Sequence, residues 1–190
     1  MSAADKTLST WIQRACEEIS APFDEIVDTK EITAMLETLC SAQKIALYGV
    51  GREGLMMRAL TMRLYHLGLD AHPVGDMTTP ALGSEDCLVV SAGPGFFATV
   101  EALVNVAEAN EARIVLLTAN LESQLRSRAD VSVVLPARTM DDTTDSAAIL
   151  PMGSTYEGAL FLFSEYLVSR LQKTLAVSEE FMRHNHTNLE

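Results

Sequence analysis

Hydrophobic residues recur along the chain in two patterns, short continuous runs and longer stretches with helical spacing. The short runs predict five buried strands, at 44–48, 70–74, 87–91, 113–117 and 131–135. Helical spacing predicts the helices between them, at about 55–67, 97–109 and 123–129. Alternating strands and helices form right-handed crossovers, which make the strands parallel and place helices on both faces of the sheet. We therefore expect an α/β fold, a three-layer α-β-α sandwich around a five-stranded parallel sheet in flavodoxin-like order.

Helical patterns flank this alternating core at both ends. Residues 1–42 predict two helices. The first has an apolar face made by Leu8, Trp11, Ile12, Ala15 and Ile19. The second continues from Ile26 to Leu39, and residues 154–190 predict a long helix to about Leu175 followed by a short terminal helix or tail. The polar stretch 138–153 between core and long helix predicts a functional or mobile loop.

Composition limits the classes of function. The 190 residues carry a formal net charge of −12, and 48% are hydrophobic, so we expect one folded domain. An acidic chain argues against a nucleic-acid partner, although one local site can still hold a small anion. We expect no signal peptide, because charged residues interrupt the N-terminal segment, and no apolar run is long enough to span a membrane. The three scattered cysteines suit reduced, mostly buried thiols. We expect a cytoplasmic protein without a membrane partner.

Two glycine-bearing turns follow predicted strands, where ligands of parallel sheets bind. Gly49-Val50-Gly51-Arg52 follows the first strand, and Ser91-Ala92-Gly93-Pro94-Gly95 follows the third. Glycine lets an anion approach backbone N–H groups at a helix N-terminus. Either turn alone also fits a purely steric role, but on neighbouring strands the two would direct their amides into one crevice.

A third group of residues opens the long C-terminal helix. Ser154 and Glu157 have the spacing of a capping box, in which the hydroxyl and the carboxylate each accept a backbone N–H. The alternative is that Glu157 projects into the crevice as a general base.

Five segments together carry a resemblance to a known family. They are 49–52, 62–68 (Met-Arg-Leu-Tyr-His-Leu-Gly), 74–80, 150–157 (Leu-Pro-Met-Gly-Ser-Thr-Tyr-Glu) and 186–190 (His-Thr-Asn-Leu-Glu). In consistent order from Lys44 to Glu190, they resemble the 6-phospho-3-hexuloisomerases, which are sugar isomerase (SIS) domain proteins. The resemblance implies a single SIS domain over 1–190, with the helices of 1–42 and 154–190 packing on the core and in oligomer contacts.

The resemblance also implies an activity and its residues. The family interconverts 3-hexulose 6-phosphate and fructose 6-phosphate through a cis-enediol, without a cofactor or a metal, as a homodimer or homotetramer with sites at subunit interfaces. Glu157 matches the family's catalytic base, Arg52 its site arginine and His66 its histidine, although a buried, hydrogen-bonded helix residue is the simpler interpretation of His66. The expected substrate- and phosphate-binding residues are Gly49, Gly51, Arg52, Ser91, Gly93, Gly95, Thr99, Thr78, Thr79 and Ser154.

The chain departs from the family pattern in both turns. Glu53 stands where the family has serine, and Pro94, Phe96 and Phe97 stand in a segment where the family has hydroxyl-bearing residues. We expect Glu53 to occupy or repel the space that a phosphate needs, with Arg52 able to neutralise it. The phosphate group is then held differently, through the Gly93 and Gly95 amides and the Thr78-Thr79 turn, or the ligand is not the family's usual phosphosugar.

Two functions from different classes therefore stay open. The first is an isomerase of phosphorylated sugars that uses Glu157 as its base. The second is a non-catalytic phosphosugar-binding or regulatory SIS-domain protein. No metal site is expected, because His184 and His186 have no third ligand at a suitable spacing.

Overall fold

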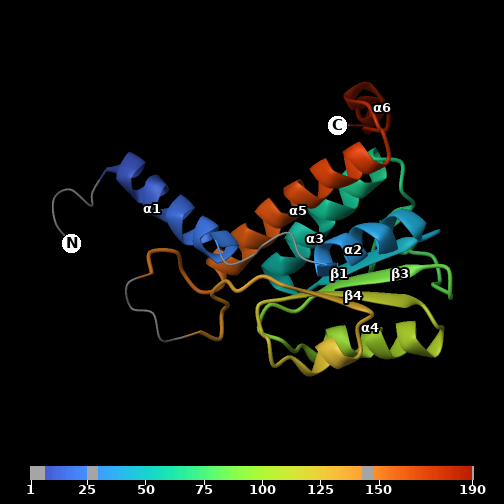
Figure 1. Ribbon diagram of the computed structural model, residues 1–190, viewed down its shortest axis with the longest axis horizontal. Coiled ribbons are helices and arrows are strands. Elements are labelled where there is room, and N and C mark those ends of the chain that lie inside the picture. Colours follow the sequence, from blue (N-terminus) through green and yellow to red (C-terminus); the bar gives the residue numbers. More distant parts are fainter. Residues whose placement is uncertain (1–6, 25–29, 143–147, 190) are drawn as a thin grey trace.

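A parallel sheet lies between two layers of helices (Figure 1) in the computed structural model, which describes residues 7–24, 30–142 and 148–189. The strands are β1 (Ile45–Gly49), β2 (Ala71–Pro73), β3 (Cys87–Ser91), β4 (Arg113–Thr118) and β5 (Val131–Val134). Their order is β2-β1-β3-β4-β5, and every neighbouring pair is parallel. This is the flavodoxin-like order, so the expected fold class is confirmed.

The helices match the expected pattern with two differences. They are α1 (Leu8–Ser20), α2 (Lys30–Ser41), α3 (Gly51–His66), α4 (Ala98–Ala109), α5 (Ser154–Thr174) and α6 (Glu179–His184), with 3₁₀ turns η2 (Ala21–Asp24) and η3 (Gln124–Ser127). Helix α3 begins at Gly51 and not near Leu55, because Gly51 adopts a left-handed φ of 58° that turns the chain directly from strand to helix. The stretch 123–129 forms only the short turn η3. Ile26, Glu190 and the part of the polar loop at 143–147 lie outside the described residues.

Alternation along the strands divides the core into two halves. Leu47, Val89 and Leu117 belong to the cluster that α2, α3 and α5 cover. Leu88 and Leu116 point to the opposite face, where α4 and η3 cover them. Successive side chains of a strand point to opposite faces, so continuous apolar strands require helices on both sides of the sheet.

Helix α1 leaves most of its predicted apolar face exposed in the single chain. Of that face only Ala15 is buried, whereas Leu8 and Trp11 are 76% and 41% exposed. Figure 1 shows α1 extending away from the sandwich beside the N-terminal end of α5. Its attachment is at its C-terminal end, where the Glu18 carboxylate accepts the backbone N–H groups of Ile149 and Leu150. At that end Ile19 packs against Gly158 of α5, whereas Leu8, Trp11 and Ile12 of the apolar face stay exposed among the described residues.

The three cysteines are free thiols that differ in their burial. Cys87 is buried, whereas Cys40 is partly buried and Cys16 is exposed. The expectation of mostly buried thiols is therefore wrong. Burial raises the pKa of the Cys87 thiol to about 12, which keeps it protonated and unreactive. Within the described ranges, no helix has the length and apolar character that crossing a membrane requires.

Candidate active site

The strand order reverses between β1 and β3, and both glycine-bearing turns lie at this point. β1 runs through Val50 into α3, and β3 runs through residues 92–97 into α4. The two strands pair directly, with Gly49 opposite Ser91. In open parallel sheets the crevice outside the carboxyl ends of the strands at such a switch point is where ligands bind. The structure thus brings the two turns together as the sequence predicts.

The glycines of the first turn have a packing role. A Cβ atom on Gly54 would lie 2.5 Å from the carbonyl oxygen of Gly49, and one on Gly49 would lie 3.0 Å from the backbone carbon of Glu53. Both glycines therefore allow the first turn of α3 to pack closely on the end of β1. This close packing directs Arg52 and Glu53, the second and third residues of α3, toward the switch point.

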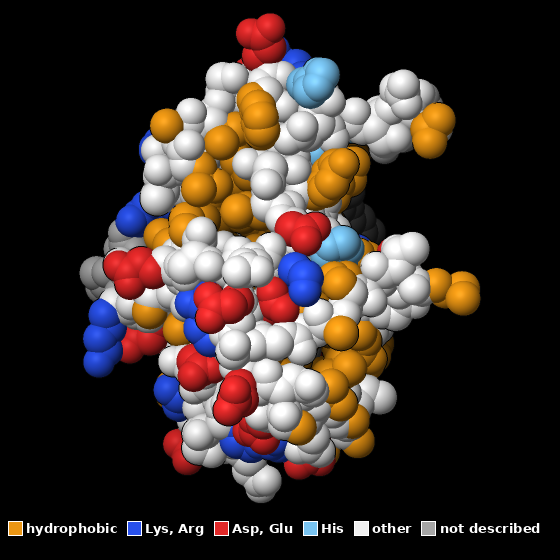
Figure 2. Space-filling view, turned by 90° about the vertical axis from the view of Figure 1, so that its right-hand side faces the viewer, with side chains coloured by type: hydrophobic (Ala, Val, Ile, Leu, Met, Phe, Trp, Pro, Cys, Tyr) orange, Lys and Arg blue, Asp and Glu red, His pale blue; other side chains and the backbone are white. Residues whose placement is uncertain are grey.

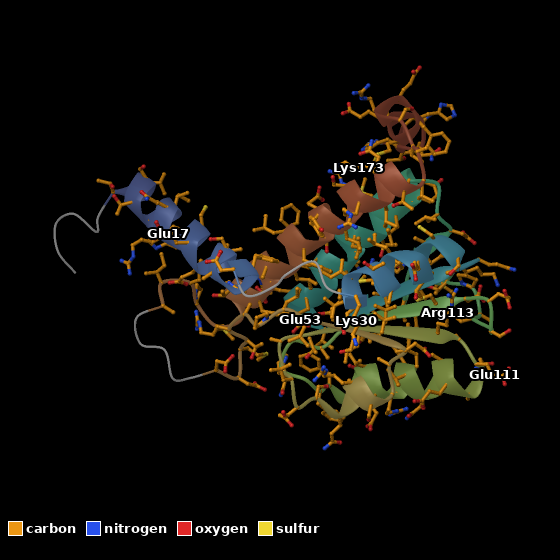
Figure 3. The ribbon with its side chains drawn as sticks, in the orientation of Figure 1. Glu17, Lys30, Glu53, Glu111, Arg113 and Lys173 are labelled. Carbon is orange, nitrogen blue, oxygen red and sulfur yellow. The ribbon has the colours of Figure 1, made fainter. Side chains whose placement is uncertain are left out.

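The buried centre of the site is the carboxylate of Glu53. Its Oε2 atom accepts hydrogen bonds from Ser91 Oγ at 2.6 Å and from the Gly93 backbone N–H at 3.0 Å. The Tyr156 hydroxyl lies 3.1 Å from Ser91 Oγ. Because Ser91 gives its only proton to Glu53, Tyr156 is the donor in this contact. Figure 3 shows Glu53 between the sheet and the helical layer, in contrast to Glu17, Glu111 and Lys173 at the periphery.

Burial determines the protonation of this centre. Desolvation raises the pKa of Glu53 above its usual range, and the nearby Glu157 raises it further, while the bonds from Ser91 and Gly93 act in the opposite direction. Burial, and then the negative field of Glu53, also raise the pKa of Tyr156, so its hydroxyl stays protonated and remains a donor. The expectation that Glu53 occupies the place of an anion agrees with this geometry, since its carboxylate holds the Ser91 hydroxyl and the Gly93 amide.

A second carboxylate, Glu157, lies on the outer side of the site beside Arg52. Arg52 Nε is 3.0 Å from Glu157 Oε2, and an Arg52 terminal nitrogen donates to Ser154 Oγ at 3.2 Å. The Glu157 side chain is 15% exposed and that of Arg52 is 64% exposed. The Nε contact is an ion pair without hydrogen-bond geometry, so within the described part of the chain Glu157 Oε2 accepts no hydrogen bond. A shielded carboxylate oxygen that accepts none is suited to taking a proton from a ligand.

These contacts correct two expectations. The capping box is wrong, because α5 has Gly153 as its N-cap without a side-chain cap, and Ser154 is the first helical residue. The Ser154 hydroxyl accepts from Arg52 instead. The neutralisation of Glu53 by Arg52 is also wrong, because Arg52 forms its ion pair with Glu157. The two glutamates therefore have different partners, backbone and hydroxyl donors for Glu53 and a guanidinium for Glu157.

The turn after β3 offers fewer free donors than its glycines indicate. The Gly95 amide donates to the Ala92 carbonyl at 2.8 Å, and Asn120 Nδ2 donates to the Pro94 carbonyl at 2.9 Å. Gly95 has a φ of 103°, and a Cβ there would lie 2.8 Å from Asn120 Nδ2, so the residue is glycine for steric reasons. The Gly93 amide is held by Glu53. Neither of the two amides expected to bind the ligand is free in this state.

Three threonines were also expected to bind the ligand, and none of them contacts the Glu53 carboxylate through a hydrogen bond found among the described residues. Thr99 is exposed in the first turn of α4. Thr78 and Thr79 belong to the turn after the edge strand β2, and the Thr79 hydroxyl donates to the carbonyls of Pro73 and Asp76 within that turn. The Thr79 hydroxyl therefore stabilises its own turn.

His66 lies at the other end of the molecule from Glu157. It is the last residue of α3, fourteen positions after Arg52, or about 21 Å at the ordinary helical rise of about 1.5 Å per residue. It is buried, its ring centroid is 5.0 Å from that of His186, and its carbonyl accepts from Asn185. Within one chain, the structure does not bring His66 to Arg52 and Glu157.

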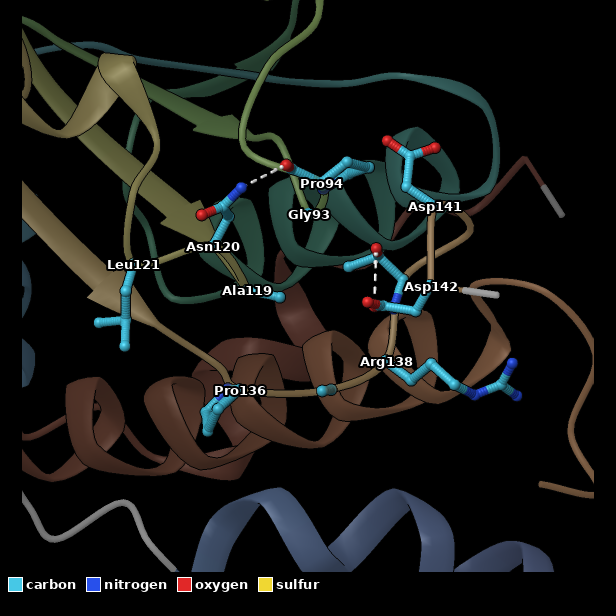
Figure 4. Close-up of a pocket in the computed structure, with 11 residues that line it drawn as sticks. Gly93, Pro94, Ala119, Asn120, Leu121, Pro136, Arg138, Asp141 and Asp142 are labelled. Atoms are coloured by element: carbon cyan, nitrogen blue, oxygen red, sulfur yellow. Dashed lines mark hydrogen bonds between the residues drawn. The ribbon is translucent and has the colours of Figure 1, made fainter. Parts of the chain in front are cut away.

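A cavity of about 620 Å³ adjoins the site at the carboxyl ends of β3, β4 and β5. It is lined by Gly93, Pro94, Ala119, Asn120, Leu121, Pro136, Ala137, Arg138, Thr139, Asp141 and Asp142. Gly93 belongs both to this cavity and to the Glu53 centre, whereas Arg52 and Glu157 approach Glu53 from the α3 and α5 side. Figure 4 shows the Asn120 side chain donating to the Pro94 carbonyl and the Thr139 hydroxyl donating to the Asp142 carboxylate. The volume is sufficient for a sugar-sized ligand.

Sequence reasoning missed Asn120, Arg138 and Tyr156. Asn120 and Arg138 follow β4 and β5, so the rule that ligands bind at the carboxyl ends of strands already pointed to them. Tyr156 gave no such signal, because an aromatic residue next to a helix start is usually a core residue. Within the described ranges, no group of three or more metal-ligating side chains comes together.

Solved structures with the same architecture define the class. A protein from Methanococcus jannaschii, whose structure was used to infer a 3-hexulose-6-phosphate isomerase function, superposes with a TM-score of 0.82 at 25% identity, over 95% of this chain and 99% of its own. The same strand order and the paired turns at the switch point are thus those of a sugar isomerase (SIS) domain protein.

Sequence relatives narrow the class to a family. The 3-hexulose-6-phosphate isomerase of Bacillus subtilis is 31% identical over 86% of this chain and 89% of the relative. That of Mycobacterium gastri is 33% identical over 86% of this chain and 82% of the relative. No family model matches the chain. At this identity and coverage, the chain belongs to the 3-hexulose-6-phosphate isomerase family.

Proposed function

We propose that the protein is a phosphosugar isomerase that interconverts 3-hexulose 6-phosphate and fructose 6-phosphate, with Glu157 as the base. The observation that carries the proposal is the Glu157 carboxylate, mostly shielded from solvent, next to a cation and with an oxygen that accepts no hydrogen bond from the described residues. The names of its relatives in Bacillus subtilis and Mycobacterium gastri support the substrate class.

The chemistry requires proton transfer between two adjacent carbons. Glu157 removes the proton from C2 of the 3-keto sugar, and the C3 carbonyl becomes an enediolate oxygen. Return of the proton to C3, with loss of the O2 proton, gives the 2-keto sugar. Arg52 lies 3.0 Å from Glu157 and half-exposed to the crevice, so its guanidinium is placed to stabilise the oxyanion that develops during the transfer. The reaction balances without a cofactor.

Several of the expected ligand-binding residues keep a role in this proposal. The first turn of α3, with Gly51, and the exposed Thr99 of α4 present donors to the crevice from two sides. Ser154 holds the Arg52 guanidinium. His66 takes part in the reaction only if a second copy of the chain brings it to the site; otherwise it is a structural residue that packs against the C-terminal segment.

We also propose that the protein acts as a cytoplasmic homodimer or homotetramer. Exposed apolar residues on α1, α3 and α5 support this assembly. They are Leu8, Trp11, Ile12, Leu55, Met62, Tyr65, Phe161, Leu162 and Tyr166. Figure 2 shows the face of the molecule away from α1, with hydrophobic side chains exposed both in its upper part and along its lower right side. A second copy covering such a face would bury this apolar area.

The activity is tested by following 3-hexulose 6-phosphate by NMR with the wild-type protein and two variants. Glu157→Gln removes the base, and we expect conversion to fructose 6-phosphate to slow by about 10²–10⁴-fold. Glu165→Gln is the matched control, because Glu165 pairs with Arg63 at 3.5 Å between the same two helices. Its rate should stay near that of the wild type.

The same samples distinguish an isomerase from a non-catalytic phosphosugar-binding protein. The Glu53 contacts, which occupy donors of the turn after β3, are the observation that favours a non-catalytic binding module. Thermal stabilisation by the sugar phosphate without any conversion, in folded wild-type protein, would establish that function and refute the isomerase proposal.

A further inference from the structure

The turn after β3 already contains an anion in this structure. Ser91 Oγ and the Gly93 N–H both donate to one oxygen, Glu53 Oε2, at 2.6 and 3.0 Å. A hydroxyl and a backbone amide that converge on one point are the donors with which proteins hold a phosphate oxygen. We call these two donors the β3 cradle. Its present occupant is a carboxylate from the neighbouring helix α3.

The fit around this carboxylate leaves no room for a second anion. A Cβ atom on Gly93 would lie 2.9 Å from Glu53 Oε1 and 2.7 Å from two ring carbons of Tyr156. Glu53 is 7% exposed and Ser91 is fully buried. A methyl group added at Gly93 would therefore collide with both Glu53 and Tyr156. A phosphate group is larger than a methyl group, so it cannot share the cradle with the Glu53 carboxylate.

Charge adds to this exclusion. Glu157 acts on Glu53 as a like charge, and the guanidinium of Arg52 is directed to Glu157. A phosphate dianion approaching the cradle would meet two carboxylates, and the nearby guanidinium of Arg52 is already paired with one of them. At a few ångströms and low dielectric, such like charges repel strongly.

We propose that Glu53 is a specificity-determining residue of this site, an internal carboxylate that competes with a ligand's phosphate group for the β3 cradle. The inference rests on the proposed function, because it concerns the same crevice. In the state with Glu53 bound, the cradle rejects the phosphorylated end of a sugar. A hydroxyl-bearing end carries no charge for the two carboxylates to repel, so the crevice accepts it in place of the phosphorylated end. The chain thus binds phosphate weakly at the cradle compared with the same site without the glutamate.

Calorimetric titration with inorganic phosphate tests this competition directly. Glu53→Ser removes the carboxylate and leaves space at the two donors, and we expect it to bind phosphate at least about tenfold more tightly than the wild type. Glu53→Gln keeps the size and one acceptor oxygen but removes the charge, so its gain should be smaller. Glu101→Ser is the control, because it removes a carboxylate from the first turn of the adjacent helix α4 without touching the cradle. Its phosphate affinity should equal that of the wild type.

The outcomes separate this inference from the proposed function. Phosphate affinity that is unchanged in folded Glu53→Ser would overturn the inference, as would an equal gain in Glu101→Ser. If Glu53→Ser does not fold, the presence or absence of a gain in Glu53→Gln decides. None of these titrations depends on turnover. If phosphate affinity does not change but the wild type converts the sugar phosphate, only this inference is wrong. If phosphate affinity rises as expected but the wild type converts nothing, only the proposed function is wrong.

Discussion

At the scale of single residues, the site is a pair of glutamates with contrasting surroundings. Glu53 is buried, and its carboxylate oxygen accepts from a hydroxyl and an amide. Glu157 lies next to Arg52 and retains an oxygen without a hydrogen bond from the described residues. Two carboxylates in such different environments are suited to different roles: one occupies donors of the turn after β3, and we propose that the other accepts a proton.

The burial of Glu53 predicts a pH-dependent contribution to stability. Its pKa is raised in the folded protein, so between the unfolded and the folded pKa the native state binds more protons than the unfolded state. The free energy of unfolding contributed by this group therefore falls as pH rises through that interval. Tyr156 and Glu157 from α5 face this group, and the cation Arg52, its neighbour on α3, is paired with Glu157.

Urea unfolding of wild-type protein and Glu53→Gln across pH 4–8 measures this contribution. The amide does not titrate, so we expect the stability of Glu53→Gln relative to wild type to increase with pH. A relative stability that does not change over this range, or that decreases, would show that Glu53 is not destabilised by burial. Glu101→Gln serves as the control for loss of one surface carboxylate.

At the scale of elements, the sequence pattern located the strands and the turns after them. Continuous apolar runs are specific for strands buried on both faces, and the glycines at 49, 51 and 93 marked the turns of the site. The partners of charged side chains were not predictable in the same way. Arg52 has Glu53 next to it in sequence but reaches Glu157, because successive residues of a helix point in different directions. The capping box failed because Ser154, which its spacing from Glu157 suggested as the N-cap, is the first residue inside α5, and the observed N-cap is Gly153.

The packing of α3 on β1 predicts a strong effect of a single methyl group. Alanine at Gly54 would place its Cβ 2.5 Å from the Gly49 carbonyl oxygen, which is backbone and cannot move away without displacing the strand. We expect Gly54→Ala to lower the free energy of unfolding by about 1–3 kcal/mol in spite of the better helix propensity of alanine.

Chemical denaturation of Gly54→Ala and of the control Gly158→Ala measures how much free energy of unfolding each variant loses. Gly158 is also inside a helix, but the three atoms nearest to a Cβ there all belong to the side chain of Ile19, the closest at 2.8 Å, and none is backbone. Gly158→Ala should therefore lose much less stability. Equal losses in the two variants would argue against a special close approach of α3 to β1.

At the scale of the whole molecule, one layer of the sandwich has an unusual surface. Leu55 and Leu162 are 58% and 44% exposed on α3 and α5, which pack against each other, and Leu8 and Trp11 are exposed on α1, which contacts α5. The chain has a net charge of −12, which opposes association of copies unless apolar contact outweighs it. Self-association through this layer would also decide whether His66 of one copy comes near the Glu157 of another.

Light scattering after gel filtration tests the assembly. We expect the wild type to have the mass of two or four chains, and Leu162→Glu to shift the protein toward smaller species. Val106→Glu is the control, because Val106 is 60% exposed on α4, in the opposite helical layer. A monomeric wild type, or the same shift in both variants, would contradict the assembly through α1, α3 and α5.

The central claim is that Glu157 moves a carbon-bound proton, and deuterium exchange measures that step most directly. In deuterated water the wild-type protein should place deuterium at C3 of fructose 6-phosphate, which is the carbon that the 2,3-enediol reprotonates. Glu157→Gln should exchange about 10²–10⁴-fold more slowly. Wild-type protein that leaves C3 fully protonated, or a glutamine variant that exchanges at the wild-type rate, would contradict the account.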